Sequence, residues 1–207
     1  MKRTLAFAAS LLLLGACSSD GYTIRGKIAG LDNPYVYLLR YTGEVEVIDS
    51  AKVTKGDFVF KGKAEQPEVV YLSTDKQQPF VHFFLENGRI SVDGALSAPA
   101  DIAVLGTPSN DIQRAFDEKI AALEEEFAKT GNDVQRDSLR KEYSKLMSDA
   151  VEMNRDNIYG VTTFLNNAYA FLSPEEVMEQ IALFPAEWQQ RRELTELREA
   201  TERKLRV

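Results

Sequence analysis

The spacing of hydrophobic residues divides the chain into two parts. Between Tyr22 and Val104, hydrophobic and polar residues alternate in short runs that end at Gly, Pro, Asn or Asp, and a period of two residues is typical of β-strands. The turn Asn87-Gly88 favours a type I′ hairpin with positive φ at both residues. The pattern predicts an antiparallel β-sandwich of about eight short strands, at residues 22–28, 35–40, 44–53, 57–63, 68–74, 80–86, 89–94 and 100–105.

Some of these predicted strands are hydrophobic on both faces. Val81, Phe83 and Leu85 alternate with Phe80 and Phe84, whereas a sheet with one wet face alternates cleanly between hydrophobic and polar residues. We therefore expect Phe80 and Phe84 to be buried by something other than the opposite sheet. The helices that follow are the natural cover.

After Gly106 the hydrophobic period becomes helical. One stripe runs from Ile112 to Phe127 and a second from Leu139 to Ala150, at spacings of three and four residues. A third helix is predicted over 161–172 and a last one from about 186 to the end, while Ser173-Pro174-Glu175-Glu176 combines an N-cap, a first-position proline and a capping-box glutamate. The fold class is therefore α+β, with a sandwich domain at 22–106 and an all-helical region at 107–207.

The N-terminal residues have the features of a lipoprotein signal peptide. Lys2 and Arg3 precede an apolar run from Leu5 to Leu14, which is too short to span a membrane. Leu14-Gly15-Ala16-Cys17 resembles the lipobox of bacterial lipoproteins, which implies cleavage between Ala16 and Cys17. Residues 1–16 are then the signal peptide, Cys17 carries two or three acyl chains that anchor the protein stably, and 17–21 form the anchor and a short tether. The alternative is a secreted protein with a chance cysteine.

Charge and cysteine content exclude several classes of function. The formal net charge is −7, and it becomes −9 when Lys2 and Arg3 leave with the signal peptide; such a chain is a poor partner for nucleic acid. On net charge alone it has no attraction for an anionic bilayer either, so membrane attachment depends on the lipid at Cys17. A single cysteine excludes an internal disulfide, a CxxC pair and a multi-cysteine metal site. We expect no metal and no cofactor.

Candidate catalytic residues are few. His82 is the only histidine, and in mid-strand we interpret it as a partly buried structural residue rather than as a general base. Asp49-Ser50 lacks a nearby base, so Asp49 is read as a turn-organising carboxylate. Glu124-Glu125-Glu126 point in different directions on a helix and are read as a solvated face rather than an ion site. The sequence therefore predicts no enzyme.

Four tyrosines form the best candidate for a ligand or partner surface. Aromatic rings stack on sugar rings, so a strand region rich in tyrosine is compatible with carbohydrate binding. Tyrosine is also an ordinary strand-forming residue, so the same pattern fits a half-buried sheet. The four positions are Tyr35, Tyr37, Tyr41 and Tyr71.

Order and spacing of several short motifs point to a known family. The motifs are Gly26-Lys27-Ile28-Ala29-Gly30-Leu31, Val36-Tyr37-Leu38, Asp49-Ser50-Ala51, Gly56-Asp57-Phe58-Val59-Phe60-Lys61-Gly62, Pro67, Glu86-Asn87-Gly88, and Gly106-Thr107 with Asn110. From about Tyr22 to Phe116 the chain resembles the N-terminal domain of unknown function that precedes a thioredoxin-like domain, of the alkyl hydroperoxide reductase/thiol-specific antioxidant type, in many envelope lipoproteins. The CxxC that carries the redox chemistry of the later domain has no counterpart among these 207 residues, so the thiol-disulfide activity is not expected here and one hypothesis is a free-standing relative of the redox lipoproteins.

The resulting expectation is a non-catalytic, lipid-anchored protein of the Gram-negative cell envelope. Ser18 after the lipidated cysteine is typical of sorting to the outer membrane, facing the periplasm. Its partners are then the membrane, through Cys17, and another envelope protein. The alternatives are a glycan- or small-ligand-binding lipoprotein that uses the tyrosines, an enzyme centred on His82, and a truncated relative of the redox lipoproteins.

Overall fold

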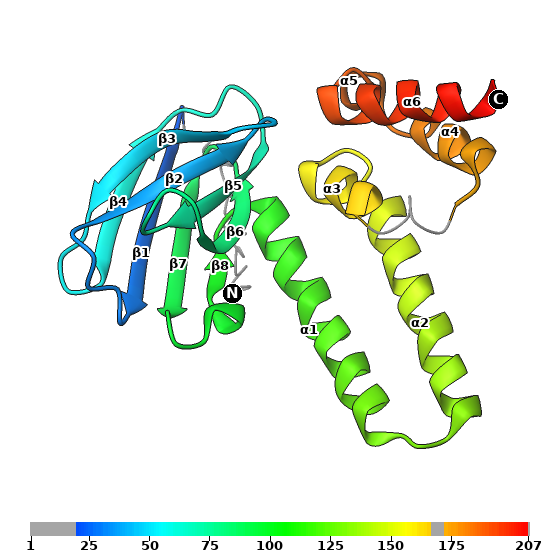
Figure 1. The fold of residues 1–207 in the computed structure, drawn as a ribbon, viewed down its shortest axis with the longest axis horizontal. Coiled ribbons are helices and arrows are strands. Elements are labelled where there is room, and N and C mark those ends of the chain that lie inside the picture. Colours follow the sequence, from blue (N-terminus) through cyan, green and yellow to red (C-terminus); the bar gives the residue numbers. More distant parts are fainter. Residues whose placement is uncertain (1–19, 167–171, 207) are drawn as a thin grey trace, which may run out of the picture.

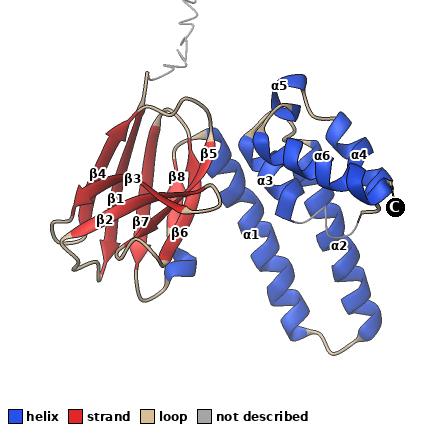
Figure 2. Ribbon diagram, turned by 45° about the horizontal axis from the view of Figure 1, so that its top comes forward, coloured by secondary structure: helices blue, strands red, loops and turns tan. Residues whose placement is uncertain are grey.

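The computed structural model describes residues 20–166 and 172–206. They form a β-sandwich followed in the chain by helices, and the two parts lie side by side (Figure 1). Figure 2 shows the strands on one side of the molecule and the helices on the other. The predicted α+β class is confirmed.

The sandwich contains two four-stranded sheets. One has the strand order β4-β1-β7-β8 and the other β3-β2-β5-β6. All strand pairs are antiparallel except β1 with β7, which run parallel. The strands are β1 (Tyr22–Ala29), β2 (Tyr35–Tyr41), β3 (Val45–Lys52), β4 (Asp57–Gly62), β5 (Glu68–Ser73), β6 (Pro79–Leu85), β7 (Arg89–Ala95) and β8 (Ala103–Leu105).

Alternate residues of each sheet fill the space between the two layers. In one sheet Ile24 stands opposite Phe60 on β4 and Ile90 on β7; in the other, Leu38 on β2 stands opposite Leu72 on β5. All five side chains are buried in one hydrophobic cluster. The period-two pattern of the sequence therefore marks the inner faces of both sheets.

Two strand predictions need correction. The eighth strand begins at Ala103 rather than residue 100, because Pro99–Asp101 form a 3₁₀ turn, in which Pro99 fits the first position without needing a donor. Asn87-Gly88 is not a hairpin, because β6 and β7 belong to different sheets. Only Gly88 has a positive φ, of 154°, and the Asn87 side chain instead pairs with both backbone groups of Ala64, at 2.9 and 2.8 Å.

Phe80 and Phe84 have different environments. Phe84 is buried among helical residues such as Phe116 and Tyr159, as predicted. Phe80 is half-buried against the sandwich core, so the prediction is wrong for it. Leu72 pairs with Val81 but Ser73 pairs with Pro79, which makes Phe80 the extra residue of a β-bulge and turns its side chain away from the helices.

The helical region begins with a long antiparallel hairpin. Its helices are α1 (Pro108–Lys129) and α2 (Asp133–Glu152), followed by α3 (Ile158–Asn166), α4 (Pro174–Ala182), α5 (Ala186–Gln189) and α6 (Arg192–Leu205). The third helix starts three residues earlier than predicted, and part of its predicted range, 167–171, lies outside the described residues. The predicted last helix is two helices, with Gln190 and Arg191 between them.

Helix α4 begins as the sequence predicts. The Ser173 hydroxyl accepts a hydrogen bond from the Glu176 N–H at 3.2 Å, and the Glu176 carboxylate accepts one from the Ser173 N–H at 2.8 Å. This reciprocal pair is a capping box. It satisfies two backbone donors that the first turn of a helix leaves without partners.

The first turn of α1 is fastened to strand β6 by polar side chains. Asn110 pairs with both backbone groups of Phe84, at 2.9 and 2.8 Å, and donates to the Thr107 hydroxyl at 2.7 Å. Nearby, the Glu86 carboxylate accepts from the Ser109 N–H and hydroxyl, at 3.0 and 2.7 Å. Because β6 is an edge strand, Asn110 supplies the backbone of Phe84 with partners that a further strand would otherwise provide.

Candidate functional site

The four predicted tyrosines come from the outer face of the sheet β3-β2-β5-β6. Val36 and Leu38 of β2 point into the core, so alternation places Tyr35, Tyr37 and Tyr41 on the opposite face. Tyr71 of β5 stands opposite Leu39, which belongs to that same outer face. All four rings therefore lie on one side of one sheet.

Only part of this aromatic set is in mutual contact. The rings of Tyr41 and Tyr71 meet edge to face with centroids 4.7 Å apart, and the Tyr71 ring lies 6.0 Å from that of His82. Tyr37 is covered by the Lys76 ammonium, 4.7 Å from the ring centroid. Tyr35, 47% exposed, lies at the other end of the strand. The compact aromatic group is thus Tyr41, Tyr71 and His82.

A cleft of about 700 Å³ separates this aromatic group from the helices. Its sandwich wall includes Tyr41, Tyr71 and His82, and its helical wall includes Thr162 of α3 with Arg191 and Arg192 at the start of α6. Figure 1 shows β5 facing α3 across this space. The cleft is therefore built from both parts of the fold and contains side chains suited to stacking and to hydrogen bonding.

Arg191 is the most unusual charged residue of the cleft. Its side chain is 8% exposed, and its nearest carboxylate, that of Glu193, lies 3.5 Å from Nη2. Among the residues that the structure describes, the buried Nε has no hydrogen-bond partner, and the guanidinium lies 5.2 Å from the centroid of the Trp188 ring. A guanidinium removed from water with one long ion pair is incompletely compensated, which favours an anionic group beside it.

Arg40 and Glu68 close the sandwich side of the cleft. Arg40 Nη2 donates to Glu68 Oε1 at 2.7 Å and its Nε donates to Oε2, while Nη1 reaches Glu46 at 3.2 Å. The hydrogen bonds with Glu68 raise the pKa of Arg40 above its usual value. In this bidentate pair each side chain neutralises the charge of the other. Arg40 and Glu68 therefore form part of the cleft wall rather than a reactive group.

His82 is exposed, which corrects the expectation that it is partly buried. It lies on the edge strand β6, where α1 covers the adjacent outer residue Phe84 but leaves His82 open. His82 and Asp117 of α1 line a second, polar pocket of about 300 Å³. Although Asp117 as a residue is exposed, desolvation of its carboxyl group raises its pKa, while Gln113 and His82 act in the opposite direction.

The lining of this polar pocket does not complete a catalytic triad. Asp117 stands near His82, but no Ser, Thr or Cys is among the described residues that line the pocket. The pair has the composition of a proton-transfer dyad without a nucleophile. Asp117 was not among the candidates that the sequence provided, because its partner His82 is distant in the chain.

The other candidates have structural environments. Asp49 does not organise a turn, which corrects the expectation: it lies in β3, beside a bulge at Ile48, and its carboxylate accepts the adjacent Ser50 N–H at 2.7 Å. Glu124, Glu125 and Glu126 are exposed. Among residues 20–166 and 172–206, no group of three His, Cys, Asp or Glu side chains is placed to hold a metal ion.

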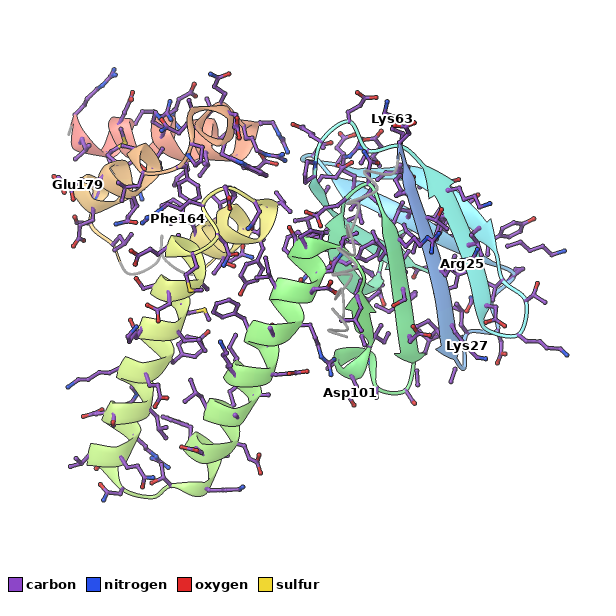
Figure 3. All side chains as sticks on the ribbon, turned by 180° about the vertical axis from the view of Figure 1, so that it is seen from behind. Arg25, Lys27, Lys63, Asp101, Phe164 and Glu179 are labelled. Atoms are coloured by element: carbon purple, nitrogen blue, oxygen red, sulfur yellow. The ribbon has the colours of Figure 1, made fainter. Side chains whose placement is uncertain are left out.

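An apolar groove of about 720 Å³ runs along the helical hairpin. Leu123 and Phe127 of α1 face Tyr143 and Met147 of α2 across it, and Phe164 of α3, labelled in Figure 3, closes one end. Exposed Arg140 and Glu124 lie on its rim. These residues belong to the two hydrophobic stripes of the sequence, and within the described residues the hairpin leaves part of both stripes uncovered.

The predicted cleavage and lipidation residues, Ala16 and Cys17, lie outside the described residues. Among the described residues, none of the helices combines the length and the hydrophobicity that a membrane span requires.

Residues 22–113 match a protein family described as Domain of unknown function (DUF4369). The match covers all eight strands and extends into the first turns of α1, so it includes Asn110 and the bonds that fasten α1 to β6. No curated protein is similar enough to the chain to count as a match. The chain therefore carries an N-terminal domain of unknown function followed by helices.

Proposed function

We propose that this protein is a non-catalytic lipoprotein of the Gram-negative cell envelope that binds another envelope protein through the groove of its helical hairpin. It is anchored by lipid on Cys17 and faces the periplasm from the outer membrane. The groove is the observation that carries the proposal. Large apolar depressions on a protein surface commonly mark binding sites.

The shape and composition of the groove favour a protein partner. Its walls are hydrophobic side chains at helical spacing, Leu123 and Phe127 opposite Tyr143 and Met147, and such a groove suits the apolar face of a helix. Exposed Arg140 and Glu124 on the rim offer charges of both signs for orientation. The resemblance to redox lipoproteins suggests a partner that carries a thioredoxin-like domain, with this chain as an accessory subunit that has no redox activity of its own.

The anchor is tested with the full chain in its host. Intact-protein mass measurement should give a mature chain that begins at Cys17 and carries acyl chains, and Cys17→Ala should move the protein from the membrane fraction to the soluble fraction or leave the signal peptide uncleaved. An unmodified Cys17 in the membrane fraction contradicts the proposal.

The partner is tested by photo-crosslinking from the groove. A photoreactive amino acid replaces Tyr143, and the matched control replaces Val134, which is 79% exposed on the same helix but outside the groove. We expect one recurrent protein joined to position 143 and absent at 134, and Phe127→Glu should abolish that crosslink. Identical products at both positions contradict the proposal.

A second function, binding of a glycan or small ligand, is favoured by the cleft. Tyr41 and Tyr71 offer a stacking surface, and Arg191 offers a guanidinium for an acidic group. A glycan array and a thermal-shift panel should then give a response that Tyr41→Ala and Arg191→Gln remove and that Tyr35→Ala, at the far end of the strand, keeps. An array without any response removes this alternative.

A further inference from the structure

The exposed face of the sheet β4-β1-β7-β8 is basic at one end. Ile24 and Ile28 of β1 point into the core, so Thr23, Arg25 and Lys27 point outward. In Figure 3, Arg25 and Lys27 follow one another along β1, and Lys63 lies at the end of the sheet where β4 finishes. Arg25, Lys27 and Lys63 are all exposed.

The strand register gathers the cations at that end. Thr23 stands opposite Lys61 on one side and Arg89 on the other, and Arg25 stands between Val59 and Ser91. Lys63 follows one residue after β4. We call these four residues, Arg25, Lys61, Lys63 and Arg89, the basic patch. All four are exposed, and none forms an ion pair within the part of the chain that the structure describes.

The opposite end of the same face is neutralised. There Lys27 stands between Asp57 of β4 and Asp93 of β7. This face of the sheet therefore has one end with charges of both signs and another end where the outward strand positions carry cations and no acidic residue. The net charge of the whole chain is −7. The net charge alone conceals this local concentration.

The chain enters the sheet at its basic end. The Gly21 carbonyl accepts the Gly88 N–H at 3.1 Å, and the Thr23 N–H donates to the Gly88 carbonyl at 2.8 Å. On its other side Gly21 lies so close to Gly62 that a Cβ at Gly21 would be 2.3 Å from the Gly62 carbonyl oxygen. The entry point is therefore held between β4 and β7, beside Lys61, Lys63 and Arg89.

Chain length places this end of the sheet near the proposed anchor. Four Cα steps separate Cys17 from Gly21, a reach of at most about 14 Å. Neighbouring strands are about 5 Å apart, so Lys61 and Arg89, on either side of β1, span about one Debye length at physiological salt. With Cys17 at the membrane surface, the basic patch lies within range of charged headgroups.

We propose that the basic patch contacts anionic phospholipid headgroups of the membrane that holds Cys17 and thereby fixes the orientation of the sandwich on the bilayer. Cations near such a surface are attracted to it, whereas the acidic remainder of the protein is repelled. The lipid supplies attachment and the patch supplies orientation. This inference rests on the lipid anchor proposed above.

The experiment uses the mature, lipidated full chain reconstituted in vesicles. Ser91, which stands opposite Arg25 on the same face, is replaced by cysteine and labelled with a fluorophore; once Cys17 is lipidated, this thiol is the only free one in the sequence. Ser138→Cys on α2 is the control position. Quenching by neutral acrylamide is compared in phosphatidylcholine vesicles and in vesicles that also contain phosphatidylglycerol.

We expect the quenching constant at position 91 to fall about threefold when phosphatidylglycerol is present, and to recover at about 1 M salt, where the Debye length is about 3 Å. Position 138 should be quenched equally in both vesicles. Substitution of all four patch residues by Gln should remove the protection, whereas the matched variant with Gln at Lys52, Lys76, Lys119 and Lys141, all exposed and outside the patch, should keep it.

The experiment distinguishes failure of the proposed lipid anchor from failure of the proposed headgroup contact. A protein that carries no lipid on Cys17 by mass measurement contradicts the anchor. A lipidated protein whose label at position 91 is quenched equally in both vesicles, or is protected equally in both, contradicts the contact with anionic headgroups and leaves the anchor intact.

Discussion

The side-chain amide of Asn110 pairs with both backbone groups of Phe84, as a neighbouring strand would. Its Oδ1 accepts the Phe84 N–H at 2.9 Å and its Nδ2 donates to the Phe84 carbonyl at 2.8 Å, and Asn110 is 2% exposed. The side chain of Phe84 at the same position packs among helical residues. One residue of β6 therefore joins the two parts of the fold through its backbone and its ring together.

We predict that Asn110→Ala lowers the free energy of unfolding by about 3 kcal/mol, because it leaves the N–H and carbonyl of Phe84 without partners in a buried site. Urea denaturation measures the change. Asn166→Ala, at an exposed position at the end of α3, is the matched control and should stay within about 0.5 kcal/mol of the wild type. Equal effects of the two substitutions would contradict the role assigned to Asn110.

The contacts of the Phe84 ring lead to a separate prediction about the interface between the sandwich and the helices. It meets the Tyr159 ring at 6.1 Å, and Tyr159 stacks on Phe116 at 5.5 Å. Phe84→Ala should cost about 3 to 5 kcal/mol and free α1 from the sheet, so that limited proteolysis cuts near residues 105–107 while the sandwich persists. Phe83→Ala, which instead leaves a cavity in the sandwich core, should destabilise the sandwich itself. Loss of both parts together in Phe84→Ala would show that they do not separate.

The elements of this fold were predictable from the sequence because each depends on neighbouring residues. Alternation located the eight strands, and Ser173-Pro174-Glu175-Glu176 located the start of α4. The pairing of strands depends on contacts distant in the chain: Asn87-Gly88 suits a hairpin locally, yet its strands belong to different sheets. The bulge that turns Phe80 inward has the same origin, since it arises from the register between β5 and β6.

The candidate sites were less predictable than the fold. The sequence identified Tyr41, Tyr71 and His82 individually, but their approach to Arg191 depends on how α6 packs beside the sandwich. Arg191 gives no signal in the sequence, where it is one of several arginines near the C-terminus. The basic patch was hidden by an acidic net charge, because a sum over the chain carries no information about one face of a sheet.

The capping box of α4 gives a third prediction. Ser173→Ala removes the hydroxyl that accepts the Glu176 N–H and should lower stability by about 1 kcal/mol. Ser173→Asp, which restores an acceptor at the N-cap, should recover most of that loss. Thermal unfolding followed by circular dichroism measures both variants, and an alanine variant as stable as the wild type would show that the cap is dispensable.

The pH dependence of stability at high pH gives the fourth prediction. Burial raises the pKa of Tyr159 to about 12, although a hydrogen bond with Thr163 acts in the opposite direction. A tyrosine with a higher pKa in the folded state than in the unfolded state binds its proton more tightly when folded. Its contribution to stability is therefore complete below pH 10 and is lost as the pH rises from about 10 toward 12.

Urea unfolding at a series of pH values tests this loss. The free energy of unfolding should fall between about pH 10 and 12, by roughly 2 kcal/mol from this one group, and Tyr159→Phe should remove that share of the slope. Tyr35→Phe is the control, because Tyr35 is 47% exposed, and its slope should match the wild type. A Tyr159→Phe variant with the wild-type slope would mean that the hydroxyl of Tyr159 is as free to ionise in the folded protein as in the unfolded chain.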